Sequence, residues 1–204
     1  MIKNVILDIG NVLGYFQWRE LGRECMKLND EEFEIFAEAM INSGLWDEFD
    51  KAYMTDDEII AAIAKGMPEL ADRIPEFFKR VDDIVIDYDY ACPWIDELHA
   101  QGFKVYILSN YGKTAFEKGT KKRLKFVPMV DGKVISYEIK KVKPHKEIYE
   151  CLLEKYGLKA DECVFFDDRA ENVEGAERVG IHGLLFTGIE KAKEDLNAAV
   201  RQFN

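Results

Sequence analysis

Four short apolar segments recur along the chain, and they are rich in the β-branched and aromatic residues that buried strands favour. They are residues 4–9 (NVILDI), 103–109 (FKVYILS), 163–167 (CVFFD) and 182–186 (HGLLF). Because their apolar character is nearly continuous, we expect strands that are covered by helices on both faces, as in parallel sheets. The sequence therefore predicts an α/β fold with a doubly wound, Rossmann-like parallel sheet.

Helical patterns separate these strands, and they occur at 93–102, 144–157, 170–180 and 188–203. Residues 15–88 interrupt the alternation, because they carry only helical patterns, at 18–28, 30–43, 55–66 and 75–87. We therefore expect a Rossmann-like core made of residues 1–14 and 89–204, with an all-helical cap inserted at residues 15–88. Asp131-Gly132 predicts a small hairpin.

The charge and the cysteines limit the partners and the compartment. A net charge of −11 argues against general binding to nucleic acids or to anionic membranes. No apolar stretch is long enough to span a bilayer. The four cysteines are scattered without a C-x-x-C pair, which indicates free thiols in a reducing cytoplasm. We expect a cytoplasmic monomer or homodimer.

Polar side chains end the predicted strands, at the point where ligands gather in doubly wound sheets. Asp8 ends the first strand, Ser109-Asn110 the second and Asp167-Asp168 the third. Singly, each has an ordinary explanation as a helix cap or a turn residue. Two adjacent aspartates at a crowded strand end repel each other, however, so that this pair needs a cation or solvent.

Four motifs occur in a fixed order: ILDIGNVL (6–13), YILSN (106–110), KVKPHKEIY (141–149) and VFFDDRAENVEGA (164–176). With them the chain resembles the haloacid dehalogenase-like hydrolase superfamily over almost its whole length. The long helical segment is similar to that family's C1-type cap. The last two motifs most resemble the branch that includes bacterial sugar-phosphate phosphatases, such as glucose-1-phosphate phosphatases, some of which also carry Asp-x-Gly-Asn-Val.

The resemblance implies a role for each motif residue. Asp8 would attack phosphorus and form an aspartyl-phosphate, while Lys143 would neutralise both groups. Ser109 and Asn110 would hold the phosphate oxygens of a small phosphorylated metabolite, such as a hexose 1-phosphate. The metal ligands of Mg²⁺ would be Asp8, the backbone carbonyl of Gly10, Asp168 and, directly or through its neighbour, Asp167, which Asn172 would orient.

Gly10 departs from the pattern of most family phosphatases, which carry an Asp there that protonates the leaving oxygen. Such help is worth about 10²–10⁴-fold in rate. Either the substrate has a good leaving group, or a residue of the cap or a water supplies the proton, or the site binds phosphate without efficient turnover. A metal-independent dehalogenase and a phosphate-binding regulatory module stay open as alternatives.

The segment GYFQWRE (14–20) lies close to Asp8 in sequence and is expected to contact the substrate. Its candidate substrate-binding residues are Tyr15, Trp18 and Arg19. Aromatic rings here either form the hydrophobic base of the cap or stack on a sugar ring.

Overall fold

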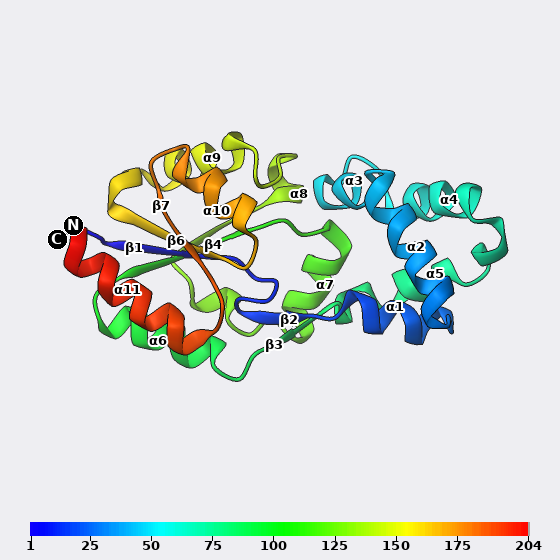
Figure 1. Ribbon diagram of the computed structural model, residues 1–204, viewed down its shortest axis with the longest axis horizontal. Coiled ribbons are helices and arrows are strands. Elements are labelled where there is room, and N and C mark those ends of the chain that lie inside the picture. The colour runs from blue at the N-terminus through cyan, green and yellow to red at the C-terminus, as the bar shows by residue number, and fades with distance from the viewer. Residues whose placement is uncertain (204) are drawn as a thin grey trace.

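A computed structural model describes residues 1–203, apart from the side chains of residues 41 and 42. Its centre is a five-stranded sheet in which all neighbouring strands are parallel (Figure 1). The strand order is β5 (Gly132–Ile135), β4 (Lys104–Ser109), β1 (Asn4–Leu7), β6 (Cys163–Asp167) and β7 (His182–Leu185). The predicted α/β parallel fold is confirmed.

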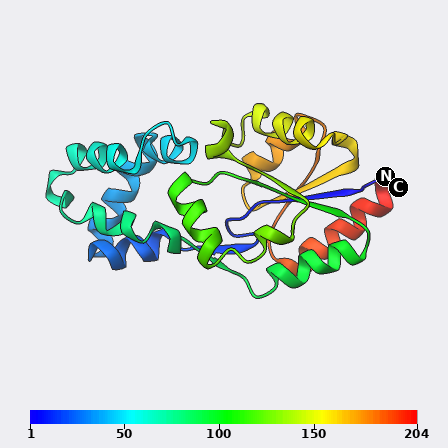
Figure 2. The ribbon, with the colours of Figure 1, turned by 180° about the vertical axis from the view of Figure 1, so that it is seen from behind.

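Side chains of successive strand residues point to opposite faces of the sheet, and each face carries its own layer of helices. On one face, Val5 and Leu7 share a buried cluster with α6 (Ala91–Ala100) and α11 (Ile189–Phe203). On the other, Ile6 packs in a cluster with α9 (Lys146–Tyr156) and α10 (Ala170–Glu177). Figures 1 and 2 show these two layers above and below the sheet. This double covering explains the continuous apolar character of the strands.

A separate helical part follows the first strand. Its base is a two-stranded antiparallel ribbon of β2 (Gly14–Phe16) and β3 (Val85–Asp87). Between these strands the described residues form α1 (Trp18–Met26), α2 (Asp30–Asn42), α3 (Leu45–Lys51), α4 (Asp56–Gly66), α5 (Ile74–Lys79) and two 3-10 turns, Pro68–Leu70 and Val81–Asp83. We call residues 17–84 the helical segment. It lies at the end of the molecule opposite to the marked chain ends (Figure 1).

Two local predictions are wrong. The helix expected at 75–87 ends at Lys79, and residues 85–87 instead form β3, because Val85 packs against Gly14 of β2. The hairpin expected at Asp131-Gly132 is absent from the described chain, and the residues from Gly132 extend the sheet as a parallel edge strand. Gly132 is needed there because a Cβ would lie 2.4 Å from the ring of Tyr156.

Three helices were not expected from the sequence: α3, α7 (Lys113–Lys122) and α8 (Ser136–Ile139). The four cysteines carry free thiols. Within residues 1–203, no helix combines the length and the apolar character that a membrane span requires.

Candidate active site

The three central strands deliver polar side chains to one edge of the sheet. Leu7 of β1 pairs with Ile107 of β4 and with Phe166 of β6, so the residues that follow these positions come level with one another. The backbone N–H of Asp8 continues the alignment by donating to the Phe166 carbonyl at 3.0 Å. As a result Asp8, Ser109 and Asp167 are buried at the carboxyl end of the sheet. They lie around the central strand β1, where the order in which strands are added to the sheet changes direction.

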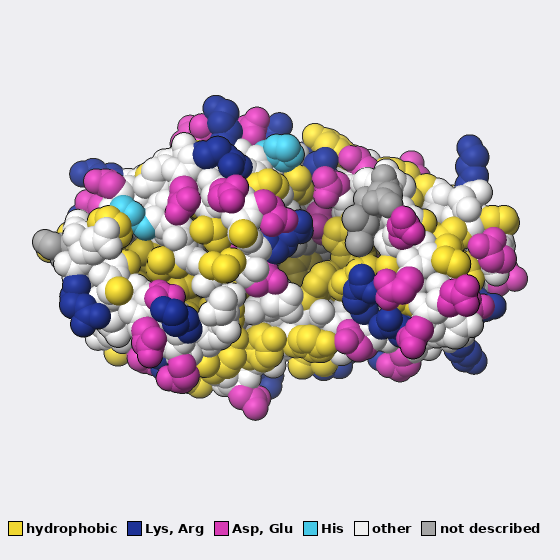
Figure 3. Space-filling view, viewed as in Figure 1, with side chains coloured by type: hydrophobic (Ala, Val, Ile, Leu, Met, Phe, Trp, Pro, Cys, Tyr) yellow, Lys and Arg dark blue, Asp and Glu magenta, His cyan; other side chains and the backbone are white. Residues whose placement is uncertain are grey.

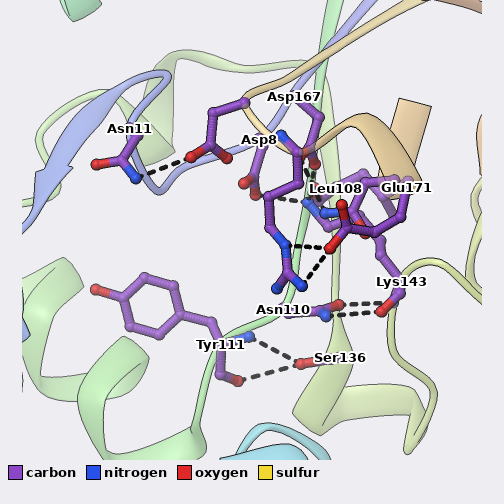
Figure 4. A network of polar contacts seen from close by, with 12 residues as sticks. Asp8, Asn11, Leu108, Asn110, Tyr111, Ser136, Lys143, Asp167 and Glu171 are labelled. Atoms are coloured by element: carbon purple, nitrogen blue, oxygen red, sulfur yellow. Dashed lines mark hydrogen bonds and ion pairs between the residues drawn. The ribbon is translucent and has the colours of Figure 1, made fainter. Parts of the chain in front are cut away.

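Lys143 connects two of these strand ends. Its side chain is 1% exposed, and its Nζ lies 2.8 Å from Asp8 Oδ1 and 2.6 Å from Asp167 Oδ2. It also donates a hydrogen bond to the Leu108 carbonyl at 3.0 Å (Figure 4). An ammonium group buried between two carboxylates keeps its charge in this position, where it faces any anion bound at Asp8.

Asn110 fixes the backbone around this lysine. Its Oδ1 accepts a hydrogen bond from the Lys143 N–H at 2.8 Å, and its Nδ2 donates to the Lys143 carbonyl at 3.1 Å (Figure 4). Both ends of the amide are therefore engaged by the protein. Asn110 lines the cavity described below, but the structure gives it a positioning contact with Lys143.

Three carboxylates gather beside Lys143, and each of Asp8, Asp167 and Asp168 offers an oxygen atom within 4.8 Å of the others. Asp167 is saturated, since Lys143 holds Oδ2 while Asn172 Nδ2 and the Arg169 N–H both donate to Oδ1 at 2.9 Å. Asp168 accepts from Asn11 Nδ2 at 2.9 Å through Oδ2 only.

The oxygen atoms left over suit a hard divalent cation. Within the described chain, the Gly10 carbonyl accepts no hydrogen bond. Gly10 lines the same cavity as Asp8 and Asp168. Carboxylate and carbonyl oxygens are the ligands that Mg²⁺ and Ca²⁺ prefer. The donor set therefore fits such an ion at Asp8 and Asp168, with Asp167 held back by its own hydrogen bonds.

The loop after Asp8 is shaped to bring Asn11 to this cluster. Asn11 adopts a left-handed conformation (φ 56°), which asparagine tolerates better than most residues. Its N–H donates to the Gly14 carbonyl at 2.6 Å, and its Oδ1 accepts from the Phe16 N–H at 3.2 Å. The amide is thus oriented so that its Nδ2 points at Asp168.

Burial dominates the electrostatics of the site. It raises the pKa of Asp8 to about 6, with Asp167 acting in the same direction and Lys143 and Ser109 opposing it. Burial also raises the pKa of Asp168, against the hydrogen bond from Asn11. For Lys143, burial lowers the pKa, but the two neighbouring carboxylates outweigh it and the net shift is upward. The carboxylates of the site therefore outnumber its one buried ammonium group, and this excess of negative charge favours the binding of a cation.

A cavity of about 190 Å³ opens in front of these groups, between the sheet and the helical segment. Its inner wall contains Asp8, Ser109, Lys143 and Asp168, and its outer wall contains side chains of the β2–β3 ribbon and of α3, namely Phe16, Val85, Trp46, Asp47, Phe49 and Asp50. Figure 3 shows the molecule hollowed at this place, with hydrophobic side chains on the side of the helical segment.

The comparisons with known proteins agree with this geometry. A model of the haloacid dehalogenase-like hydrolases matches residues 2–180. The chain belongs to this family of hydrolases.

Its relatives include two proteins named as phosphatases. A sesquiterpene phosphatase of Aspergillus oryzae is 26% identical over 91% of this chain and 90% of its own length. A phosphatase of Mycobacterium tuberculosis is 24% identical over 100% of this chain and 94% of its own length. Among solved structures, a family enzyme of Bacteroides thetaiotaomicron in complex with magnesium and inorganic phosphate has a TM-score of 0.72 at 22% identity, covering 91% of this chain and 94% of that one.

Three of the expected substrate-binding residues of this hydrolase do not line the cavity. Tyr15 is 41% exposed and donates its hydroxyl hydrogen bond to Glu20. Trp18 packs on the rings of Phe33 and Trp46, with centroids 5.5 and 5.1 Å away. Arg19 lies over the Trp18 ring and pairs with Glu34 at 2.8 Å. These side chains make contacts within the β2 and helical region and are not part of the candidate site.

The cavity of the hydrolase also contains residues that sequence reasoning missed as site residues, namely Asn11, Asp50 and Arg169. Asn11 and Arg169 lie inside the recognised motifs, so their positions were a usable signal. Asp50 has no such signal, because it lies on α3, a helix of seven residues that the sequence pattern did not predict.

Proposed function

We propose that this hydrolase is a Mg²⁺-dependent phosphatase of small phosphorylated metabolites, acting through an aspartyl-phosphate on Asp8. The observation that carries the proposal is the pairing of a buried Asp8, 2.8 Å from Lys143 Nζ, with a cluster of carboxylates beside it. A nucleophilic carboxylate, a fixed cation and a divalent-ion site are together what phosphoryl transfer by positioning and charge stabilisation requires. Relatives named as phosphatases support the same reaction.

The residues of this chain divide the work. Asp8 attacks phosphorus, and Lys143 holds both Asp8 and a phosphate oxygen in place while negative charge builds up. Ser109, buried at the end of β4, offers a hydroxyl to another phosphate oxygen. Mg²⁺, held by Asp8, Asp168 and the Gly10 carbonyl, would neutralise the charge of the transferring group. Asp167 then acts by orienting Lys143, because both its oxygens are already bonded.

We also propose that residues 15–88 act as the cap of this hydrolase on a core of residues 1–14 and 89–204. Phe16, Trp46 and Phe49 form an apolar wall over the carboxylates. A wall of this kind excludes water from the reacting groups and shapes the space for the leaving alcohol. The cavity mixes aromatic rings with carboxylates, which are acceptors for hydroxyl groups. This mixture supports a sugar phosphate, with a hexose 1-phosphate as the sharpest version.

A dehalogenase is a weaker alternative for this site. It would attack carbon and would need no cation, so it has little use for Asp167 and Asp168 beside the nucleophile. A module that only binds phosphate would not need a nucleophilic carboxylate held by a buried lysine.

The test measures phosphate release from a panel that contains hexose 1-phosphates, hexose 6-phosphates, an isoprenoid alcohol phosphate and p-nitrophenyl phosphate. Release that needs Mg²⁺, stops with a chelator and disappears in Asp8→Asn is the expected result. Halide release from 2-haloacids that ignores the chelator would favour the dehalogenase. Silence across the panel from folded protein, with phosphate binding retained, would favour the binding module.

A further inference from the structure

Gly10 leaves the proposed reaction without its usual proton donor, so a side chain that replaces this donor has to come from elsewhere in the cavity. Asp8 and Asp168 belong to the attacking and ion-binding groups, and Lys143 is held by three contacts. Arginine does not give up a proton in proteins, which removes Arg169. Tyr111 is a poor acid here, because burial raises its pKa far above the usual value. Two carboxyl groups of α3 remain, Asp47 and Asp50.

The two α3 carboxyl groups differ in their surroundings. The Asp47 side chain is 60% exposed and lies 4.0 Å from the ammonium of Lys51. Asp50 is 7% exposed, and within the described residues its carboxyl has no hydrogen-bond or ion-pair partner. A buried carboxyl group without a protein partner, at the wall of a cavity, is free to bond to whatever occupies that cavity. Asp50 is therefore the better placed of the two.

The backbone of Asp50 is fixed to the core of the hydrolase. Its carbonyl accepts a hydrogen bond from Ser136 Oγ at 2.6 Å. The same hydroxyl oxygen accepts from the Tyr111 N–H at 2.8 Å (Figure 4). Tyr111 is two residues from Ser109, at the carboxyl end of β4. The neighbouring Phe49 packs so closely on this loop that a Cβ on Gly112 would lie 2.2 Å from its ring. These contacts hold Asp50 opposite the proposed phosphate site.

The protonation of Asp50 suits a donor. Burial raises its pKa to about 8, with Asp47 and Asp8 acting in the same direction. Lys143 and Arg169 act in the opposite direction but do not cancel the shift. The charged groups that face this carboxyl are thus Asp47 from its own helix and Asp8, Lys143 and Arg169 from the core, while Lys140, which follows α8, donates a hydrogen bond to the Ala52 carbonyl. At neutral pH the carboxyl carries a proton.

We propose that Asp50 is the general acid of this hydrolase, in place of the side chain that Gly10 lacks. The inference rests on the proposed phosphatase function. As Asp8 forms its bond to phosphorus, the bond from phosphorus to the leaving oxygen breaks, and the Asp50 proton moves to that oxygen. Water then attacks the aspartyl-phosphate and gives its proton to the Asp50 carboxylate. Phosphate leaves, and both aspartates return to their starting states.

The experiment compares leaving groups. Glucose 6-phosphate and β-glycerophosphate release ordinary alcohols, which need a proton, whereas p-nitrophenyl phosphate releases a stable phenolate. In Asp50→Asn, kcat/KM for the alkyl phosphates should fall by about 10²–10⁴-fold, and for p-nitrophenyl phosphate by less than about tenfold. Glu48→Gln removes a carboxylate from the same helix without touching the cavity and is the matched control. An equal loss on both kinds of substrate would overturn the inference.

A rescue variant and the wild-type pH profile keep the test decisive. A Cβ on Gly10 would meet Phe16 at 3.7 Å, an ordinary contact, so Gly10→Asp fits and should restore alkyl phosphate hydrolysis in Asp50→Asn. In the wild type, kcat/KM for alkyl phosphates should fall above about pH 8, and p-nitrophenyl phosphate should lack this decline. If the wild type cleaves p-nitrophenyl phosphate but no alkyl phosphate, or if its activity on alkyl phosphates shows no such decline, the proposed role of Asp50 is contradicted. The proposed phosphatase function is not affected by either result. Absence of Asp8-dependent release from every substrate contradicts the phosphatase itself.

Discussion

The buried carboxyl of Asp50 should make the stability of the protein depend on pH in a way that one substitution removes. Burial raises its pKa from 3.8 to about 8. Between these values the folded protein holds a proton that the unfolded chain has released, so the wild type loses stability as the pH rises through this window. Each pH unit above 3.8 costs about 1.4 kcal/mol until the folded pKa is reached. The cost is about 2 kcal/mol at pH 5 and about 4 kcal/mol at pH 7.

Asp50→Asn keeps the size of the side chain and cannot ionise. We therefore expect the variant to be more stable than the wild type by these amounts, with a gain that grows by about 1.4 kcal/mol for each pH unit between pH 5 and pH 7. The assay is urea unfolding of both proteins at each pH, where the difference between them cancels the titration of the groups that do not interact with Asp50. Glu48→Gln, at a half-exposed position of α3 outside the cavity lining, should change stability by less than about 0.5 kcal/mol at either pH.

A difference that is the same at pH 5 and pH 7 would refute this reasoning, because it would mean that Asp50 ionises in the folded protein as readily as in the unfolded chain. The measurement needs no substrate and no metal. It therefore tests the environment of Asp50 independently of any activity.

Three further outcomes follow from the site. Asn11→Gly keeps the left-handed backbone but removes the hydrogen-bond donor to Asp168, so the Mg²⁺ concentration that gives half-maximal activity should rise by about 10–100-fold. An unchanged Mg²⁺ concentration at half-maximal activity would show that Asn11 does not support the ion site. Asp47→Asn removes a negative charge near Asp50 and should move the alkaline decline of kcat/KM for alkyl phosphates to lower pH, whereas an unmoved decline would assign it to another group. Gly112→Ala should lower the free energy of unfolding by about 1–3 kcal/mol in a denaturant titration, because its Cβ meets the Phe49 ring. Gly66→Ala, which has open space around it, should not lower it, and equal stabilities of the two variants would show that α3 moves to accommodate the new Cβ.

The strand ends could be predicted from sequence because each buried strand leaves the same local pattern, a short apolar run that ends in polar residues. Apolar strands covered on both faces read as continuous apolar runs, and the residues after Leu7, Leu108 and Phe166 must then share one edge of the sheet. The proximity of residues 15–19 to Asp8 in sequence was misleading for a related reason. Side chains alternate along β2, so Phe16 lines the cavity while Tyr15 faces solvent.

The importance of Asp50 could not be predicted in this way. Its helix is short, begins after Gly44 in a left-handed conformation (φ 74°), and lacks a side-chain cap at its first turn. Such a helix owes its position to tertiary contacts. The contacts in this case come from Ser136, 86 residues later, and from the loop around Gly112. No periodic pattern in the sequence records them.

The hydroxyl group of Ser136 has a consequence for the rate of turnover. Ser136 Oγ bonds both to the loop after β4 and to the last turn of α3, so the helical segment cannot swing away from the sheet without breaking this link. Losing one such bond costs roughly 0.5–1.5 kcal/mol, which corresponds to slowing an opening motion up to about tenfold. In a hydrolase whose chemistry is fast, escape of the product becomes the slow event. Where opening limits turnover, a serine outside the cavity lining therefore contributes to how long each reaction cycle lasts.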